Sequence, residues 1–304
     1  MSIFHSHGVQ GIYPEEVSTE VAYRMGWAYA RYLKDDLKKV LPLEIVVGFD
    51  MRGSSPFLAR EIIRALNEQG IDVVEVGKVP TPVFYYAVAF KGYAGGVMVT
   101  GCHNPKEYNG FKFCREKATL IGLGSGLEKV KTYFESGEDV IKVKPKGKMT
   151  SLPDMTGAYV EQELSLVNRE KIKKLKVAAD PANAIGALYL EGLFQKIPCD
   201  LIHINWELNG NMPVHDPNPF KAETLRQLQE VLKNEKADLG IATDGDGDEI
   251  VFVDSLGQII LEEKLKSLVP QAFAQSDPPL SPVRIILSLA TLLSETNKSL
   301  SELV

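Results

Sequence analysis

The segment most suited to chemistry is ATDGDGD, residues 242–248, which follows an apolar run typical of a buried strand. Asp244, Asp246 and Asp248 stand at alternate positions with glycines between them, so a tight loop can turn several carboxylate oxygens toward one point. Three like charges repel one another unless a hard cation neutralises them, and all-oxygen ligation suits Mg²⁺. We therefore predict a Mg²⁺ site at this loop.

The acidic loop has other possible interpretations. A solvated acidic turn is less favourable, because carboxylates crowded after a buried strand cost stability without a counter-ion. An EF-hand loop is excluded, since it needs Gly at its sixth position and Glu at its twelfth, where this chain has Glu249 and Ser255. A phosphatase with an aspartate nucleophile stays open, because Asp246-Gly247-Asp248 loosely fits a DxD motif after a strand.

A second reactive segment is TGCHNP, residues 100–105, followed by YNGFK at 108–112. Its Gly, Asn and Pro residues are typical of a shaped loop after a strand. Cys102 is a candidate nucleophile if His103 or Lys112 supplies the positive charge that lowers a thiol pKa, and an unreactive loop cysteine is the alternative. The candidate residues of this segment are Cys102, His103, Asn104, Asn109 and Lys112.

A tyrosine-phosphatase loop is excluded at this cysteine. That class requires an arginine six residues later to hold phosphate, and Tyr108 occupies the position. Two serines in an earlier loop, Ser54 and Ser55, are expected to cap the helix that begins at Pro56.

The elements that position these loops alternate between short β-branched runs and amphipathic segments, the pattern of α/β domains. Loops at the carboxyl ends of strands are where such domains place chemistry, and both reactive segments follow strands. A segment rich in lysine, glycine and proline, residues 141–153, is predicted to be a linker between two α/β units. We predict strands at 44–49, 72–76, 96–100, 110–113, 175–179, 199–204, 238–242, 250–254 and 258–261, and helices at 14–39, 56–69, 82–90, 127–134, 154–173, 186–196, 221–234 and 283–293.

Composition excludes several classes of protein. The 304 residues are 44% hydrophobic and 24% charged, which indicates a soluble globular chain. A formal charge of −6 without a basic stripe argues against nucleic acid as a partner. The longest apolar stretch, residues 283–293, is too short to span a membrane, and the first residues lack a secretory pattern, so we expect a cytoplasmic location. Three cysteines without a CxxC pair are expected to be reduced.

A spaced set of motifs over residues 3–262 resembles the phosphomannomutase/phosphoglucomutase family, the alpha-D-phosphohexomutases. The motifs are FHSHGVQG (4–11), VGFDMRGSSP (47–56), TP (81–82), TGCHNP with YNGFK, DPAN (180–183), HDPNP (215–219) and ADLGIATDGDGD (237–248). The resemblance implies two consecutive α/β/α sandwich domains with mixed sheets, at 1–140 and 154–262. It also implies that residues 263–304 are a short helical remnant of a third domain and that a fourth domain is absent.

The same resemblance implies an activity, phosphoryl transfer between the 1- and 6-positions of a hexose phosphate. A carrier serine would stand at Cys102 with His103 beside it, and Lys112 would move the proton of the sugar hydroxyl. The aspartates matching Asp244, Asp246 and Asp248 would hold Mg²⁺. The substrate and its phosphate would be bound by Arg52, Asn104 and Asn109.

Departures from the family pattern fall on its charged positions. Gln10, Phe49 and Glu249 each stand where family members have arginine. Removing one fixed donor from a phosphoryl-transfer site commonly costs about 10²–10³ in rate, and a thiol is a poorer partner than an oxygen for Mg²⁺ chemistry. We therefore expect an impaired or inactive mutase. A non-catalytic Mg²⁺-binding or partner-binding role is the alternative, with self-association through an apolar surface left by absent domains.

Overall fold

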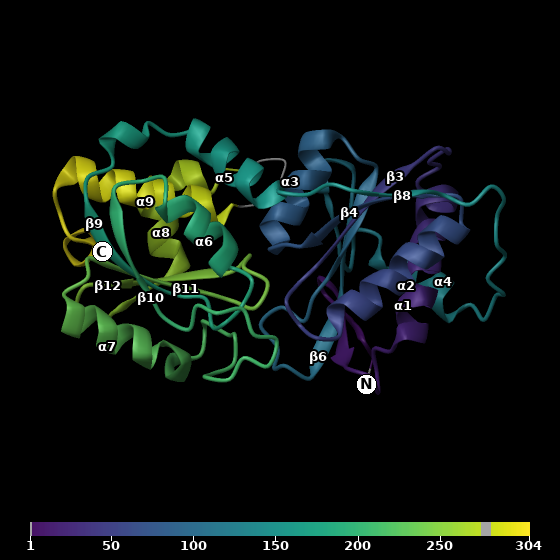
Figure 1. Ribbon diagram of the computed structural model, residues 1–304, viewed down its shortest axis with the longest axis horizontal. Helices are drawn as coiled ribbons and strands as arrows, with labels where there is room; N and C mark the ends of the chain where they lie inside the picture. Colours follow the sequence, from purple (N-terminus) through teal and green to yellow (C-terminus); the bar gives the residue numbers. More distant parts are fainter. Residues whose placement is uncertain (1, 275–280) are drawn as a thin grey trace. The chain divides into compact units, whose positions relative to one another are not determined.

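The computed structural model of the chain describes residues 2–274 and 281–304 and divides into two compact units. The first contains the chain up to Gly101 together with Lys106–Met155, and the second contains Cys102–Pro105 together with Thr156–Val304. Each unit is a mixed sheet with helices on both faces (Figure 1), as the predicted sandwich domains require. The tip of the Cys102 loop therefore groups with the acidic loop rather than with its own neighbours in sequence.

The sheet of the first unit has the strand order β1-β2-β6-β5-β3-β4-β8, with β7 paired to β6. Its centre is parallel, because β3 pairs in parallel with both β4 and β5, whereas β6 runs antiparallel to its neighbours β2 and β5. The strands are β1 Phe4–His5, β2 Gly8–Ile12, β3 Glu44–Phe49, β4 Asp72–Lys78, β5 Gly95–Val99, β6 Tyr108–Arg115, β7 Leu120–Ile121 and β8 Met149–Ser151.

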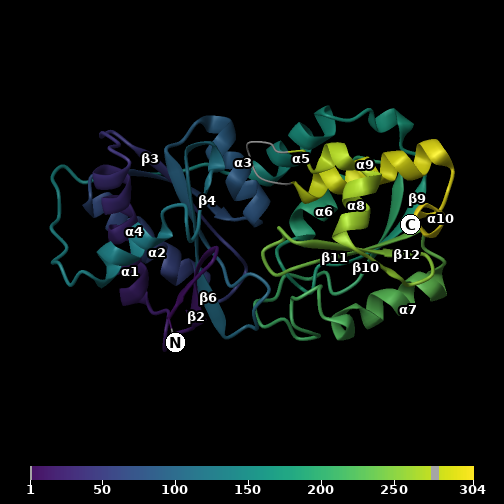
Figure 2. The same ribbon diagram turned by 180° about the vertical axis from the view of Figure 1, so that it is seen from behind.

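Helices α1 (Thr19–Arg31), α2 (Ser55–Glu68) and α4 (Leu127–Glu135) cover one face of this sheet. Helix α3 (Thr81–Lys91) covers the other, as Figures 1 and 2 both show. The predicted helix over 14–39 is shorter, because α1 passes into a π-helical segment at Tyr32–Asp36. The aromatic run Phe84, Tyr85 and Tyr86 of α3 is buried.

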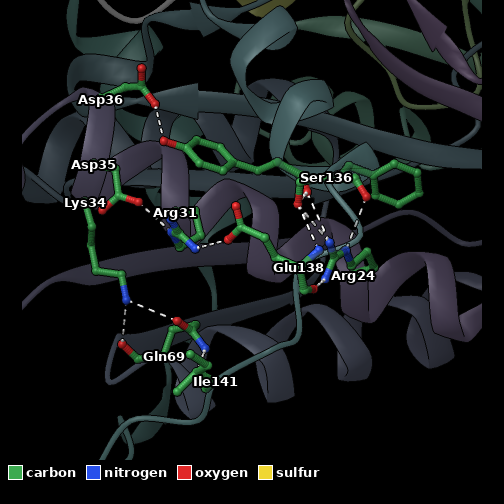
Figure 3. A network of polar contacts seen from close by, with 11 residues as sticks. Arg24, Arg31, Lys34, Asp35, Asp36, Gln69, Ser136, Glu138 and Ile141 are labelled. Atoms are coloured by element: carbon green, nitrogen blue, oxygen red, sulfur yellow. Dashed lines mark hydrogen bonds and ion pairs between the residues drawn. The ribbon is translucent and has the colours of Figure 1, made fainter.

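The chain that follows α4 is held against α1 by a polar network (Figure 3). Arg24 donates hydrogen bonds to the carbonyls of Tyr133, Phe134 and Glu138, which lie at and beyond the end of α4. Carbonyls at a helix C-terminus lack partners within the helix, so this guanidinium satisfies them. Arg31 adds an ion pair of 2.8 Å to the Glu138 carboxylate.

The predicted linker over 141–153 is partly regular structure. Its residues Met149–Ser151 form β8, which pairs in parallel with β4 at the edge of the sheet. Gln69 also donates a 2.7 Å hydrogen bond to the carbonyl of Ile141. The prediction missed this strand because its three side chains are all exposed, so no hydrophobic alternation marks it.

The second unit has the strand order β10-β9-β11-β12-β13, with a parallel half (β10, β9, β11) and an antiparallel half (β11, β12, β13). Helix α7 lies on one face, and α5, α6, α8 and α9 lie on the other (Figures 1 and 2). The elements are α5 Met155–Ser165, β9 Leu175–Asp180, α6 Ala187–Phe194, β10 Cys199–His203, α7 Arg226–Glu235, β11 Leu239–Thr243, β12 Ile250–Asp254, β13 Ile259–Ile260, α8 Glu262–Leu268, α9 Pro282–Thr296 and α10 Leu300–Leu303.

The predicted helix over 154–173 is interrupted after Ser165. Asn168 has an extended backbone, and its side chain accepts the N–H of Glu170 to start a separate 3-10 turn at Arg169–Lys171. Local side-chain hydrogen bonds of this kind compete with a continuous helix.

The last predicted helical pattern forms α9, which packs into the second unit with Val283, Leu287 and Leu289 fully buried. Ser281 precedes the helix, and its hydroxyl lies 2.5 Å from that of Tyr159. The proline-rich segment before α9 falls partly outside the described residues, at 275–280. No helix among the residues that the structure describes is long and apolar enough to cross a membrane.

Candidate functional site

The acidic loop connects two neighbouring strands of the second unit. Strand β11 is buried throughout and pairs with β12 up to Thr243 and Ile250. The next pair outward is Asp244 and Glu249, whose main chains are joined by a 3.2 Å hydrogen bond from the Asp244 N–H. Gly247 lies inside this loop with φ +74°, a left-handed conformation that glycine adopts without strain. The hairpin thus places the side chains of Asp244 and Glu249 at the mouth of one closed loop.

The three predicted metal ligands come together as the sequence indicates. One carboxylate oxygen from each of Asp244, Asp246 and Asp248 lies within 4.8 Å of the others. Asp244 and Asp246 are fully buried, and one Asp244 oxygen accepts the backbone N–H groups of Asp248 and Glu249, both at 3.1 Å. These bonds fix the direction of the Asp244 carboxylate. Buried carboxylates facing one point fit a divalent cation held by oxygen.

The negative charge of the three aspartates affects the pKa of a neighbouring tyrosine. The pKa of Tyr189 is raised well above its ordinary value, first because the side chain is buried, then by Tyr159 and by the three aspartates. Ionising a phenol beside three carboxylates is unfavourable, so the tyrosine stays neutral. The loop is therefore a region of negative potential inside the fold.

The loop that carries Cys102 touches the acidic loop through its backbone. A Cβ atom placed on Gly245 would lie 2.2 Å from the Cys102 carbonyl oxygen, so only glycine permits this approach. Cys102 itself has φ +50° and is 5% exposed. Asn104, in the same segment, is half-buried.

The side chain of His103 contacts the acidic loop. Its Nδ1 atom lies 3.0 Å from Oε2 of Glu249, and both side chains are about 40% exposed. Together with Asp244 they form a second group whose possible ligand atoms all lie within 4.8 Å. Glu249 was predicted only as a lost arginine, and its contact with His103 was not foreseen.

In the first unit, Asp50 organises the residues before the Cys102 loop, and sequence reasoning missed it. This fully buried carboxylate accepts hydrogen bonds from the Ser55 hydroxyl at 2.5 Å and from the Gly101 N–H at 3.2 Å. It also receives the backbone N–H of Arg52 at 3.0 Å. A signal was present, since Asp50 directly follows a buried parallel strand.

Arg52, predicted to bind substrate or phosphate, is 1% exposed. Its Nε atom lies 3.2 Å from Asp50, and its Nη1 atom donates to the Tyr108 carbonyl at 3.0 Å. A Cβ on Gly101 would lie 2.4 Å from the guanidinium carbon, so glycine is required there too. These contacts give Arg52 a positioning role, and phosphate binding by this residue stays a prediction.

Asn109 anchors the other end of the Cys102 loop. Its amide donates to the hydroxyls of Ser54 and Ser55 at 2.7 and 2.9 Å. Ser54 is the N-cap residue of α2, as predicted, but no side-chain capping hydrogen bond forms there, and Ser55 is the first residue of the helix. The serine hydroxyls bind the Asn109 amide and the Asp50 carboxylate instead of a backbone N–H of the helix.

The remaining predicted residues lie on the sheet of the first unit. Lys112 pairs with Met98 in β6 and β5, and Gln10 pairs with Gly110 across β2 and β6. Phe49, at the end of β3, packs against the hydrophobic core. An aromatic side chain here adds to packing where a charged one would have to reach solvent.

A further polar network follows strands β9 and β10 and involves the DPAN and HDPNP motifs. Asp180, which is buried, accepts hydrogen bonds from Asn205 at 2.9 Å, and His215 Nε2 lies 3.1 Å from the same oxygen. His215 Nδ1 lies 2.8 Å from the Asp216 carbonyl. The network holds the loop after β10.

Comparisons with known proteins agree with this architecture. Sequence models described as "Phosphoglucomutase/phosphomannomutase, alpha/beta/alpha domain I" and "domain II" match residues 1–139 and 157–257. A phosphomannomutase of Vibrio cholerae is 32% identical over 91% of this chain, and a phosphoglucomutase/phosphomannomutase of Thermococcus kodakarensis is 34% identical over 89%. A crystal structure of a family protein from Burkholderia thailandensis superposes with a TM-score of 0.77, at 29% identity over 89% of this chain.

The chain spans 58–60% of the length of these three proteins. What it matches is therefore a part of each relative.

Proposed function

Since this chain belongs to the phosphoglucomutase/phosphomannomutase family, we propose that it binds Mg²⁺ and a hexose phosphate and that its own phosphoryl transfer is slow or absent. The observation that carries the proposal is the convergence of Asp244, Asp246 and Asp248 beside a loop whose carrier position is Cys102. The first feature supports metal binding of the family type. The second feature, a cysteine at the carrier position, replaces the oxygen nucleophile of the family with a thiol.

The roles of individual residues follow from the family resemblance and from their surroundings. The three aspartates would hold Mg²⁺, which when bound supplies positive charge next to a transferring phosphoryl group. Asn104 and His103 would contact the phosphate, and Lys112 would donate or accept the proton of the sugar hydroxyl. Asp50 and Arg52 position the residue before Cys102, and Arg52 would in addition bind the substrate phosphate.

Electrostatics supports slow transfer. Glu249 places a carboxylate at a position where the family has a cation, and Phe49 packs into the core instead of offering a charge. A phosphate dianion then meets added negative charge and fewer fixed donors. Each lost donor costs about 10²–10³ in rate, so several together would suppress turnover.

An activity measurement tests the proposal. Interconversion of mannose or glucose 1- and 6-phosphates is followed with Mg²⁺ and a hexose bisphosphate activator, beside the Vibrio cholerae relative under the same conditions. We expect the chain to be slower by at least about 10²-fold. Equal turnover would contradict the proposal. The double variant Cys102→Ser with Glu249→Arg should be faster than the unaltered chain if these positions limit transfer.

Metal binding is tested separately by calorimetry. Mg²⁺ binding should survive Cys102→Ala and disappear with Asp246→Asn, which keeps side-chain size and removes the charge. The control is Glu263→Gln on α8, an exposed carboxylate outside the loop, which should bind Mg²⁺ like the unaltered chain. Loss of phosphate release from a phosphomonoester in Asp246→Asn would instead favour the DxD phosphatase. Self-association stays a prediction, which light scattering over a range of concentrations checks.

A further inference from the structure

The second ligand group of this chain differs in chemistry from the three aspartates. His103, Asp244 and Glu249 offer one imidazole nitrogen and two carboxylate oxygens, all within 4.8 Å. Imidazole suits zinc and its neighbours among the late transition metals, whereas Mg²⁺ prefers oxygen alone. We propose that these three residues bind a divalent transition metal ion of the Zn²⁺ type, in a site that shares Asp244 with the three-aspartate group.

The distance between His103 and Glu249 supports one ion between them. Zn–N and Zn–O bonds measure about 2.0–2.2 Å, so two donors on one ion lie about 2.9–3.4 Å apart. The Nδ1 and Oε2 atoms are 3.0 Å apart. The possible ligand atoms of all three side chains lie within 4.8 Å of one another, so they are gathered around one point.

The position of each ligand is fixed by a different part of the fold. Asp244 is buried, and backbone N–H groups of the loop hold one of its oxygens, the kind of outer contact that orients a metal ligand. Glu249 is held opposite Asp244 by the hairpin. His103 is brought to both by the close approach of the Cys102 backbone to Gly245.

The negative charge of the loop and its access to solvent also fit a metal site. The segment 244–249 carries four carboxylates, a concentration of negative charge that favours a bound cation. His103 and Glu249 are about 40% exposed, which leaves a path for an ion from solvent, while Asp244 forms the buried side of the site. This inference does not depend on turnover of a hexose phosphate.

Calorimetric titration of the metal-free chain with Zn²⁺ and with Mg²⁺ tests it, in a Cys199→Ser background because Cys199 is a partly exposed thiol. We expect Zn²⁺ to bind at least about tenfold more tightly than Mg²⁺. Glu249→Gln and His103→Gln should each weaken Zn²⁺ binding at least about tenfold and leave Mg²⁺ binding unchanged. Asp246→Asn should weaken Mg²⁺ binding and leave Zn²⁺ binding unchanged. Failure of this proposal and failure of the Mg²⁺ proposal are therefore distinguishable.

A matched control lies in the same unit. His203 Nε2 and Glu191 Oε2 are 3.1 Å apart, with side chains 46% and 40% exposed, and this pair belongs to neither metal group found among the described residues. Glu191→Gln should leave Zn²⁺ affinity as it was. Cys102→Ala should also retain it, since the thiol is outside the assigned ligands.

Cobalt gives a second readout. The absorption bands of bound Co²⁺ depend on its ligands, so they should shift in His103→Gln and remain in Asp246→Asn. The proposal is overturned if Zn²⁺ binds no more tightly than Mg²⁺, if Glu249→Gln keeps full Zn²⁺ affinity, or if Glu191→Gln or Cys102→Ala loses as much affinity as Glu249→Gln.

Discussion

Asp50 and Arg52 form an ion pair inside the first unit, with Oδ2 3.2 Å from Nε and neither side chain more than 1% exposed. The same carboxylate accepts the N–H of Gly101, and the same guanidinium leaves no room for a side chain there. The pair thus connects the end of β3 to the residue before Cys102. The start of the Cys102 loop is therefore positioned by two side chains that need not contact the substrate.

Replacing Asp50 by Asn should destabilise the first unit severely. The change leaves the Arg52 guanidinium buried without its carboxylate, and breaking such a pair costs about 3–5 kcal/mol. Urea unfolding measures the difference. Asp35→Asn is the control, because the Arg31–Asp35 pair is 30% and 41% exposed and should contribute less than about 1 kcal/mol. Equal effects of the two changes would contradict the structural importance of Asp50.

Gly245→Ala should displace the Cys102 loop. The added Cβ would meet the Cys102 carbonyl oxygen at 2.2 Å, and this backbone atom cannot turn away as a side chain does. Cys102, 5% exposed, should then react faster with a thiol reagent, with Cys114 remaining protected as an internal reference. Gly192→Ala is the control, because its Cβ would meet Val160 at an ordinary 3.6 Å. Unchanged Cys102 reactivity would show that the loop tolerates the methyl group.

The fold and the acidic loop were largely predictable, because their signals are local. Hydrophobic periodicity marks strands such as Glu44–Phe49, and alternating Asp and Gly residues mark a ligand loop in one short segment. The exposed strand β8 was missed, since its backbone pairing with β4 leaves no pattern in its side chains.

Contacts between distant segments could not be read in the same way. His103 and Glu249 are 146 positions apart, and nothing in either segment indicates that the other lies 3.0 Å away. Ser54 stands at the N-cap of α2, yet its hydroxyl and that of Ser55 accept hydrogen bonds from Asn109, more than fifty positions later. Tertiary competition of this kind decides what a polar side chain does.

The stability of the second unit should depend on pH through the protonation of His215. Burial acts to lower the pKa of this side chain, but hydrogen bonds to Asp180 and to the Asp216 carbonyl raise it overall above the ordinary 6.5. A raised pKa in the folded state means that protonated His215 stabilises the fold fully below pH 6.5 and that this contribution is lost as pH rises through the folded pKa.

NMR titration of the His215 ring measures the folded pKa, and urea unfolding between pH about 5.5 and about 8.5 measures the linked stability. Asp180→Asn removes the carboxylate that favours the charged ring, so it should lower the midpoint and flatten the pH dependence. A midpoint at or below 6.5 in the unaltered chain would contradict the assigned cause.

Glu163→Gln should loosen the attachment of α9. Glu163 on α5 is 2% exposed, and its two oxygens each lie 2.9 Å from a guanidinium nitrogen of Arg284, near the start of α9. Paired charge-assisted bonds of this geometry are strong, and losing the buried carboxylate leaves the arginine without its counter-charge. We expect a loss of several kcal/mol in the stability of the α9 contact, seen as faster hydrogen exchange of amides along Pro282–Thr296.

The control for this change lies on the same helix. Glu295 pairs with Lys171 at 2.6 Å, but both side chains are about half exposed, so Glu295→Gln should alter exchange little. If Glu163→Gln also leaves exchange along α9 unchanged, the helix is held by its apolar face alone. If exchange rises along α9 while α7 stays protected, the ion pair is what fastens the end of this chain to the second unit.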